Sequence, residues 1–274
     1  MGVKLTILGS GTSDGIPVVG CDCPVCRSKD TRDKRMRTSL SVEGNRGERA
    51  VIDTGPEFRL QAIRAGIKKL DGVFLTHAHA DHVHGLDDVR PLSRTMPLPV
   101  YGNSKTIDEI RERFSYIFKE TQRGGGKPRI IPTPVSEPVV LGGLTFTPIP
   151  VKHGILDILG WKIEEEAHLP CAGTISAVYL TDTSEIPAAS RKIIGKPAIL
   201  IIGALRTRPH ETHFSFEQAL TAAAEIGAER VCLTHICHDY PHEEIIEFCR
   251  NFMKERSLKG ISTEPSYDGL EITL

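Results

Sequence analysis

The segment Thr76–His82, with the sequence THAHADH, constrains this chain more than any other feature. It follows a short apolar run that is typical of the end of a buried strand. Three imidazoles and a carboxylate cannot all fill an apolar core, because each polar group there needs a partner. On an extended strand end, His77 and His79 point to one side and could grip one metal ion. Asp81 and His82 follow the turn and could grip a second ion, so the motif predicts a binuclear centre that activates water.

Composition limits the class of the protein. The chain has 274 residues, of which 39% are hydrophobic and 25% charged, as in an ordinary globular protein. A net charge of −1 argues against a nucleic-acid partner, and no apolar run approaches the roughly 20 residues of a membrane span. The N-terminal stretch is strand-like and lacks the pattern of a signal peptide. We therefore expect a cytoplasmic protein without a membrane partner.

Strand-like and helix-like stretches alternate along the chain, which predicts a layered α/β fold. Without an internal repeat or a clear linker, we expect one domain over residues 1–274. Residues 119–138 are rich in Gly, Pro and charge and are expected to form a loop or a hairpin tip. This segment could be an insert that acts as a lid or an exposed loop without a role.

Further candidate ligands follow later strand-like runs. His153, Asp182 and His235 each come directly after such a run, where α/β folds place functional side chains. The two oxygens of Asp182 could bridge two cations. Asp53 also follows an apolar strand and could either orient a ligand imidazole or hold its own turn together.

A second metal motif lies near the N-terminus. Cys21, Cys23 and Cys26 form a C-x-C-x-x-C pattern, and three thiolates this close predict a structural zinc site. Seven cysteines in a reducing compartment favour metal binding over disulfides. Zinc needs a fourth ligand, for which His238 is the first candidate and Cys237 the competitor.

Together these motifs resemble the metallo-β-lactamase superfamily of binuclear metallohydrolases. Within it the chain looks most like the PhnP group of phosphoribosyl cyclic phosphodiesterases, and the cysteine cluster is shared with PqqB-like proteins. The resemblance implies an αββα four-layer sandwich, two divalent metals (Mn or Zn), one structural Zn, and is compatible with a homodimer. It assigns His77, His79 and His153 to one metal, Asp81, His82 and His235 to the other with Asp182 bridging, and Cys21, Cys23, Cys26 and His238 to the structural zinc.

The resemblance also implies a general acid at His213, just before a predicted helix. Imidazole titrates near neutral pH and can protonate a leaving alkoxide, although a histidine in this place is often only a cap. His210 could share the task, and His84 could line the pocket or hydrogen-bond to a ligand. Gly203 departs from the pattern, because relatives commonly carry Asp at this strand end.

The residues and the resemblance predict a phosphodiesterase whose metal-bridging hydroxide attacks a small cyclic phosphodiester, with His213, Asp81 and Asp182 as catalytic residues. The same ligands could hydrolyse a lactone, thioester or β-lactam, because hydroxide also attacks carbonyl carbon. A tRNA-trimming endonuclease would need a basic surface, which the near-neutral charge does not favour. A PqqB-like metal-binding accessory protein is a further alternative.

Overall fold

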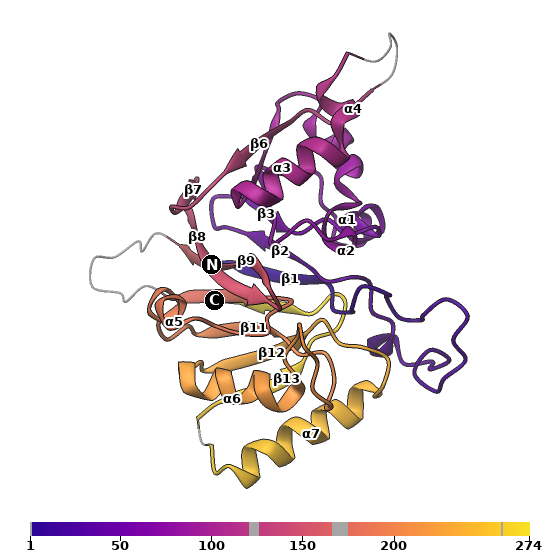
Figure 1. Cartoon of the computed structure of the whole chain (residues 1–274), viewed down its shortest axis with the longest axis vertical. Coiled ribbons are helices and arrows are strands. Elements are labelled where there is room, and N and C mark those ends of the chain that lie inside the picture. The colour runs from indigo at the N-terminus through magenta and orange to yellow at the C-terminus, as the bar shows by residue number, and fades with distance from the viewer. Residues whose placement is uncertain (1, 121–125, 166–174, 259) are drawn as a thin grey trace.

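The computed structural model describes residues 2–120, 126–165, 175–258 and 260–274. Within these ranges two seven-stranded β-sheets pack face to face, and helices cover the outer face of each sheet (Figure 1). The predicted αββα four-layer sandwich is thus confirmed. No helix in the described ranges is both long and apolar enough to cross a membrane.

The first sheet contains the strands of the N-terminal half and the last strand of the chain. Its strands are β1 Lys4–Gly9, β2 Ser39–Glu43, β3 Arg49–Ile52, β4 Gly72–Phe74, β5 Leu98–Gly102, β6 Ile130–Pro134 and β14 Glu271–Thr273. They lie in the order β14-β1-β2-β3-β4-β5-β6. Strands β3 to β6 run parallel, so their carboxyl ends lie at one edge of the sheet.

The second sheet contains the remaining strands in the order β13-β12-β11-β10-β9-β8-β7. They are β7 Val139–Leu141, β8 Leu144–His153, β9 Leu156–Glu165, β10 Ser176–Leu180, β11 Ile199–Gly203, β12 Arg230–Thr234 and β13 Ser262–Pro265. Strands β10 to β13 are parallel. Strand β8 has the same direction, because β9 is antiparallel to both β8 and β10.

The helices form the outer layers. Those of the first half are η1 Thr31–Asp33, α1 Phe58–Arg64, α2 Ala80–Val83, η2 Leu86–Ser93, α3 Ser104–Arg113 and α4 Ser115–Phe118; those of the second half are α5 Ala188–Ile194, α6 Phe216–Ile226 and α7 His242–Glu255. Ser215 and Gln218 form a reciprocal capping box at the start of α6, the helix that was predicted after His213. Gly227 ends this helix in the left-handed conformation that glycine adopts without steric cost.

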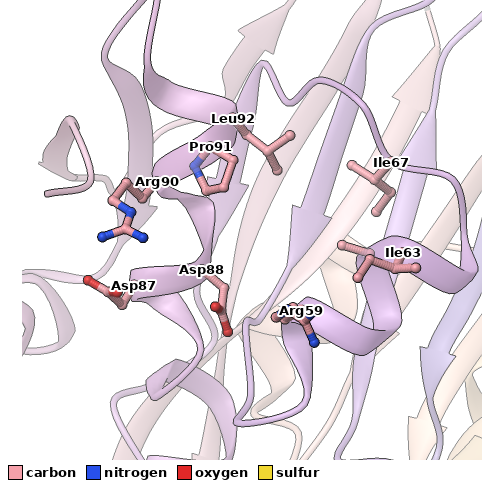
Figure 2. A pocket seen from close by; sticks show the side chains of 9 residues that line it. Arg59, Ile63, Ile67, Asp87, Asp88, Arg90, Pro91 and Leu92 are labelled. Carbon is pink, nitrogen blue, oxygen red and sulfur yellow. The ribbon is translucent and has the colours of Figure 1, made fainter. Parts of the chain in front are cut away.

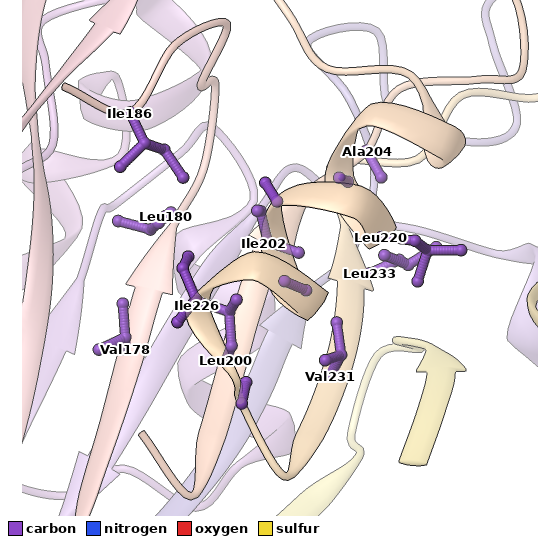
Figure 3. Close-up of a cluster of buried hydrophobic side chains, with 14 of the residues drawn as sticks. Val178, Leu180, Ile186, Leu200, Ile202, Ala204, Leu220, Ile226, Val231 and Leu233 are labelled. Atoms are coloured by element: carbon purple, nitrogen blue, oxygen red, sulfur yellow. The ribbon is translucent and has the colours of Figure 1, made fainter. Parts of the chain in front are cut away.

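Apolar side chains fill the space between the two sheets and the spaces between each sheet and its helices. Between the sheets, the rings of Phe74 and Phe146 stack at 3.9 Å and Trp161 meets Phe74 edge-on. On the outer face of the second sheet, α6 packs its apolar side onto β10, β11 and β12, with Leu220 and Ile226 among the contacting residues (Figure 3). Each such side chain contributes about 1.5–3 kcal/mol when buried. These apolar contacts hold the two sheets against each other. They therefore also hold in place the strand ends that carry the predicted polar site residues.

The segment 119–138 differs from its prediction. Residues 130–134 form β6, an edge strand of the first sheet, and residues 121–125 lie outside the described ranges. The sequence did not predict this strand because Pro132 and Pro134 disfavour strand formation. Proline is nevertheless tolerated in an edge strand, which has only one neighbouring strand. Before this segment, helices α3 and α4 follow each other directly and are divided at Phe114.

Candidate metal centre

The predicted ligands lie together at the edge where the parallel strands of both sheets end. In the first sheet, Asp53 follows β3 and the segment Thr76–His82 follows β4. In the second sheet, His153 is the last residue of β8, and Asp182 and His235 follow β10 and β12. The topology therefore joins polar side chains that are far apart in the sequence.

Potential ligand atoms form overlapping groups, in each of which they lie within 4.8 Å of one another. The groups at this edge are His77, His79 and His153; Asp81, His82, Asp182 and His235; and His153, Asp182 and His213. Asp182 Oδ2 is 3.2 Å from His82 Nε2, and Oδ1 is 3.2 Å from His235 Nε2. Because Asp182 also belongs to a group with His153, its carboxylate lies between the two main clusters.

Backbone strain is concentrated at these strand ends. Asp53, Asp182 and His235 have φ values of 62°, 53° and 57°, in the left-handed region that residues other than glycine rarely adopt. Such conformations cost on the order of 1–3 kcal/mol each and persist only where surrounding contacts hold them. The chain thus tolerates local strain where β3, β10 and β12 deliver their side chains to the site.

Asp53 orients two of the imidazoles. Its fully buried carboxylate accepts hydrogen bonds from His82 Nδ1 at 2.7 Å and from both the amide and the hydroxyl of Thr76 at 2.8 Å. Since the Thr76 hydroxyl donates to Asp53, its oxygen accepts from His77 Nδ1 at 3.0 Å. Both rings therefore carry their proton on Nδ1 and keep the Nε2 lone pair for a metal. Of the two roles considered for Asp53, the structure shows the orienting one.

His153 is oriented from a different element. Its Nδ1 donates to the backbone carbonyl of Thr212 at 2.8 Å, which again leaves Nε2 as the free donor atom. Sequence reasoning did not single out Thr76 or Thr212. The sequence carried no signal for Thr212, because its contact with His153 is made by a backbone group across the fold.

Carboxylates dominate the electrostatics of the centre. Burial opposes the charged form of His82, yet its pKa lies well above the ordinary value. The cause is the carboxylates of Asp182, Asp53 and Asp81 around the ring. Burial also favours neutral Asp182, but His235 and His82 hold the pKa of this carboxyl well below its usual range. A point where several carboxylates converge suits a cation.

Several buried ring nitrogens without a hydrogen bond indicate whether a metal ion would fit the centre. The Nε2 atoms of His77, His82 and His235 are buried and form no hydrogen bond in the part of the chain that the structure describes, although two of them face the Asp182 carboxylate at 3.2 Å. Buried polar atoms normally have partners, so lone pairs that converge in this way indicate metal ligands. Imidazole and carboxylate donors suit Zn, Mn and Fe. The residues present thus fit divalent metal ions.

His213 borders the centre. Its ring lies 4.7 Å from the His153 ring and 4.8 Å from the His235 ring, and Nδ1 is 3.8 Å from Asp182 Oδ1. Burial, aided by His235, lowers the pKa of His213 to about 3, so the free side chain is neutral near pH 7. The position allows a proton donor, and its group with His153 and Asp182 also allows a metal ligand.

Glycines allow the close approaches that shape the centre. A β-carbon at Gly85 would lie 2.0 Å from the Gly55 carbonyl oxygen, so the turn after β3 packs directly on the chain after α2. A β-carbon at Gly203 would lie 3.0 Å from the Asp182 amide nitrogen. The glycine that departs from the expected Asp therefore lets β11 pack tightly against the backbone of Asp182.

The cysteine motif forms a separate cluster. The Sγ atoms of Cys21, Cys23 and Cys26 lie 3.5, 3.5 and 3.4 Å from His238 Nδ1. A hydrogen bond from the Cys26 amide lowers the pKa of Cys23 to about 6, towards the thiolate that metals bind. Cys237, the competing candidate, is absent from the ligand groups of the described residues, and its sulfur accepts from the Asp239 amide. The geometry fits four ligands around one Zn²⁺ ion.

His84 stands apart from the ligand groups of the described residues. Its side chain is exposed and packs edge-on against Phe114 at 6.4 Å. A cavity of about 310 Å³ between α1 and η2 is also separate, because no candidate ligand lines it (Figure 2). Its walls combine Asp87, Asp88 and Arg90 with the apolar side chains of α1. Neither His84 nor this cavity therefore adds a residue to the candidate metal centre.

Comparison with known proteins agrees with this fold. Residues 48–236 match the Beta-lactamase superfamily domain. A crystal structure described as a new diphosphatase from the PhnP family is 40% identical, has a TM-score of 0.83, and aligns over 100% of this chain and 98% of that one. Ribonuclease Z of Bradyrhizobium diazoefficiens is 32% identical over 81% of this chain and 91% of its own length.

Another relative is about twice as long as this chain. The octanoyltransferase of Porphyromonas gingivalis is 38% identical over 98% of this chain, which spans 51% of that protein. The fold, the matched domain and the His/Asp clusters define the class: the chain belongs to the metallo-β-lactamase superfamily, and its clusters are those of a metal-dependent hydrolase. Within that superfamily the protein is PhnP-like, as its sequence predicted.

Proposed function

We propose that this protein is a binuclear metal-dependent phosphodiesterase that hydrolyses small cyclic phosphodiesters. The observation that carries the proposal is Asp182, whose two oxygens face His82 and His235 while its carboxylate also groups with His153. Two bound divalent cations, Mn²⁺ or Zn²⁺, would supply an activated water and a counter-charge for phosphate oxygens. The similarity to a PhnP-family diphosphatase supports phosphate chemistry.

The ligand assignment follows the two clusters. His77, His79 and His153 would hold one cation, Asp81, His82 and His235 the other, and Asp182 would be shared. Asp53 accepts from His82 Nδ1 and the Thr212 carbonyl accepts from His153 Nδ1, so the Nε2 atoms of these two rings are the ones that would bind metal. The cysteine cluster with His238 would hold a structural zinc, which would stiffen the chain that follows His235.

His213 would act on the leaving oxygen. The neutral ring donates one N–H, and a phosphate anion bound beside it would raise its pKa, because an opposite charge favours the protonated form. The imidazole could then transfer a proton to the alkoxide that departs when the P–O bond breaks. His213 is therefore the proton donor in this proposal.

Hydrolysis of bis(p-nitrophenyl) phosphate by Mn-loaded protein tests the proposal. The wild type should release p-nitrophenol, and Asp182→Ala should reduce kcat by several orders of magnitude, because the shared carboxylate is lost. The control is Asp71→Ala, a partly exposed carboxylate outside the ligand groups that hydrogen-bonds the Arg49 amide. Full activity of Asp182→Ala would refute the binuclear mechanism.

A carbonyl ester is the second candidate substrate. The observation that favours it is the octanoyltransferase relative, since acyl transfer acts at carbonyl carbon. Ile155, in the turn after His153, and Leu156, the first residue of β9, are exposed apolar residues that could contact an acyl chain. A panel of p-nitrophenyl octanoate, an octanoyl thioester and the phosphodiester separates the candidates. Turnover of the acyl esters alone would reverse the assignment, and turnover of none would favour an accessory protein of the PqqB-like kind.

A further inference from the structure

Three buried hydroxyl groups, those of Thr38, Tyr179 and Thr234, contact one another in the interior of the sandwich. The Thr38 hydroxyl lies 3.1 Å from the Tyr179 hydroxyl and 3.1 Å from the Thr234 hydroxyl. All three residues are buried, and Tyr179 belongs to the apolar layer between the sheets. A hydroxyl in such a layer is costly unless it is hydrogen-bonded, and a satisfied polar network fixes one arrangement of a core. We call these residues the hydroxyl triad.

The hydroxyl triad joins the two sheets. Thr38 directly precedes β2 of the first sheet, whereas Tyr179 lies in β10 and Thr234 ends β12 of the second sheet. A hydroxyl has a single hydrogen, so Thr38 donates to one partner and accepts from the other. Both contacts are made only when the sheets keep one relative position. The triad therefore adds directional contacts to an apolar layer whose own attraction has no direction.

The two members on the second sheet adjoin predicted metal ligands. Thr234 immediately precedes His235, and Tyr179 lies three residues before Asp182. Burial raises the pKa of the Tyr179 phenol, and the nearby Asp53 carboxylate raises it further. The triad therefore lies within electrostatic reach of the centre, on the strands that deliver two of its ligands.

The member on the first sheet is also tied to the centre. Ser39, the residue after Thr38, donates its hydroxyl hydrogen to the backbone carbonyl of Asp53 at 2.8 Å. The Asp53 carboxylate in turn accepts from His82 Nδ1. Thr38 thus contacts the second sheet while Ser39 contacts Asp53, because adjacent side chains of an extended chain point to opposite sides. A shift of Thr38 relative to the second sheet would also move the backbone that carries Asp53.

We infer that the hydroxyl triad is a positioning device, which holds the ligands of the second sheet at a fixed distance from those of the first and so sets the separation of the two metal ions. This inference rests on the binuclear centre of the proposed function. Its effect should be larger for the ion at His235, because Thr234 adjoins this ligand. His153 lies on β8 and is oriented separately by the Thr212 carbonyl.

A matched pair of substitutions at Thr38 tests the triad. Thr38→Val keeps the size of the side chain and removes the hydroxyl, whereas Thr38→Ser keeps the hydroxyl and removes a methyl group. Protein stripped of its active-centre metals would be titrated calorimetrically with Mn²⁺. Thr38→Val should weaken one of two binding steps by roughly 3- to 10-fold, the range expected for a lost buried hydrogen bond, and leave the other nearly unchanged. Thr38→Ser should bind as the wild type does. Equal weakening of both steps in Thr38→Val, or of neither, would overturn the inference.

A spectroscopic measurement gives an independent test, which also applies if Thr38→Val does not fold. The electron paramagnetic resonance spectrum of the form with two Mn²⁺ ions depends on their separation. Tyr179→Phe removes one hydroxyl of the triad and should change this spectrum. The control is Tyr101→Phe, because the Tyr101 ring stacks on Phe74 in the same layer and its hydroxyl forms no hydrogen bond within the described ranges. The same spectrum in Tyr179→Phe and Tyr101→Phe would overturn the inference.

Both measurements are made without turnover, so failure of the triad and failure of the proposed reaction are distinguishable. The expected changes in Mn²⁺ binding and in the spectrum, without hydrolysis of any phosphodiester, would support the triad and refute only the reaction. Hydrolysis of phosphodiesters with wild-type Mn²⁺ binding in Thr38→Val would overturn only the triad. A single Mn²⁺ binding step in the wild type would overturn the inference together with the binuclear centre.

Discussion

Replacement of Asp53 by Asn should disable the metal centre while it changes the shape of the protein very little. In the wild type, one carboxylate oxygen accepts from the Thr76 amide, and the other accepts from the Thr76 hydroxyl and from His82 Nδ1. A carboxamide accepts through its oxygen atom only, because its nitrogen atom is a donor. It therefore cannot accept from the Thr76 amide, the Thr76 hydroxyl and His82 Nδ1 in the wild-type arrangement. Either orientation of the new side chain leaves a conflict.

If the amide nitrogen faces the hydroxyl, Thr76 must donate to His77 Nδ1 instead of accepting from it. His82 must likewise turn its Nδ1 into an acceptor. Both rings then carry their proton on Nε2, where it blocks metal binding. If the amide nitrogen instead faces the Thr76 backbone amide, two buried donors oppose each other, at a cost of about 1–3 kcal/mol.

The expected loss of metal affinity in Asp53→Asn is about 10- to 100-fold, or roughly 1.4–2.7 kcal/mol. Competition with a chromophoric chelator measures the affinity, and long-range ¹H–¹⁵N spectra of the imidazoles report the tautomers. The control is Asp268→Asn, a buried carboxylate that accepts from Ser10 and Met36 and contacts no ligand histidine. Wild-type affinity and wild-type tautomers in Asp53→Asn would refute the orienting role.

Three further perturbations test other parts of the structure. Gly203→Ala should destabilise the protein by about 1–3 kcal/mol and weaken metal binding, because the new methyl would press on the Asp182 amide; unchanged urea midpoint and affinity would contradict this packing. Cys23→Ser should lose one zinc per chain by elemental analysis, and retention of that zinc would exclude a cysteine-cluster site. Burial and nearby arginines lower the pKa of His242 to about 4, so the unfolded imidazole binds a proton before the folded one does. Urea unfolding should therefore show the wild type losing up to about 3 kcal/mol relative to His242→Phe as pH falls from about 6.5 to 4, and parallel pH profiles would contradict it.

The sequence pointed to candidate ligands where these are adjacent in the chain or follow apolar runs, and the structure brings the candidates close together. Residues 76–82 and the cysteine motif are local patterns that can be seen directly in the sequence. The end of a buried strand is indicated by a polar residue that follows an apolar run. His153, Asp182 and His235 could be proposed for this reason, and the topology places them together. His238 was the first candidate for the fourth zinc ligand and Cys237 the competitor, and the structure places the His238 imidazole among the thiols.

The sequence was less informative where three-dimensional contacts decide. Strand β6 contains prolines that oppose strand formation locally, and only its place at the sheet edge makes them acceptable. Thr212 orients rings through backbone groups, which any residue type could supply. The sequence showed only that Gly203 departs from the family pattern, and the structure adds that a side chain there would press on the Asp182 backbone. Such features depend on distances between segments that only the fold defines.

Dependence of turnover on the amount of metal tests the central claim most directly. The active centre would be stripped with a mild chelator that leaves the cysteine-bound zinc in place, and Mn²⁺ would be added back in measured equivalents. A binuclear phosphodiesterase predicts that hydrolysis of bis(p-nitrophenyl) phosphate rises until two equivalents per chain are bound and then stays constant. Full activity at one equivalent, with no further gain from a second that binds, would contradict the account.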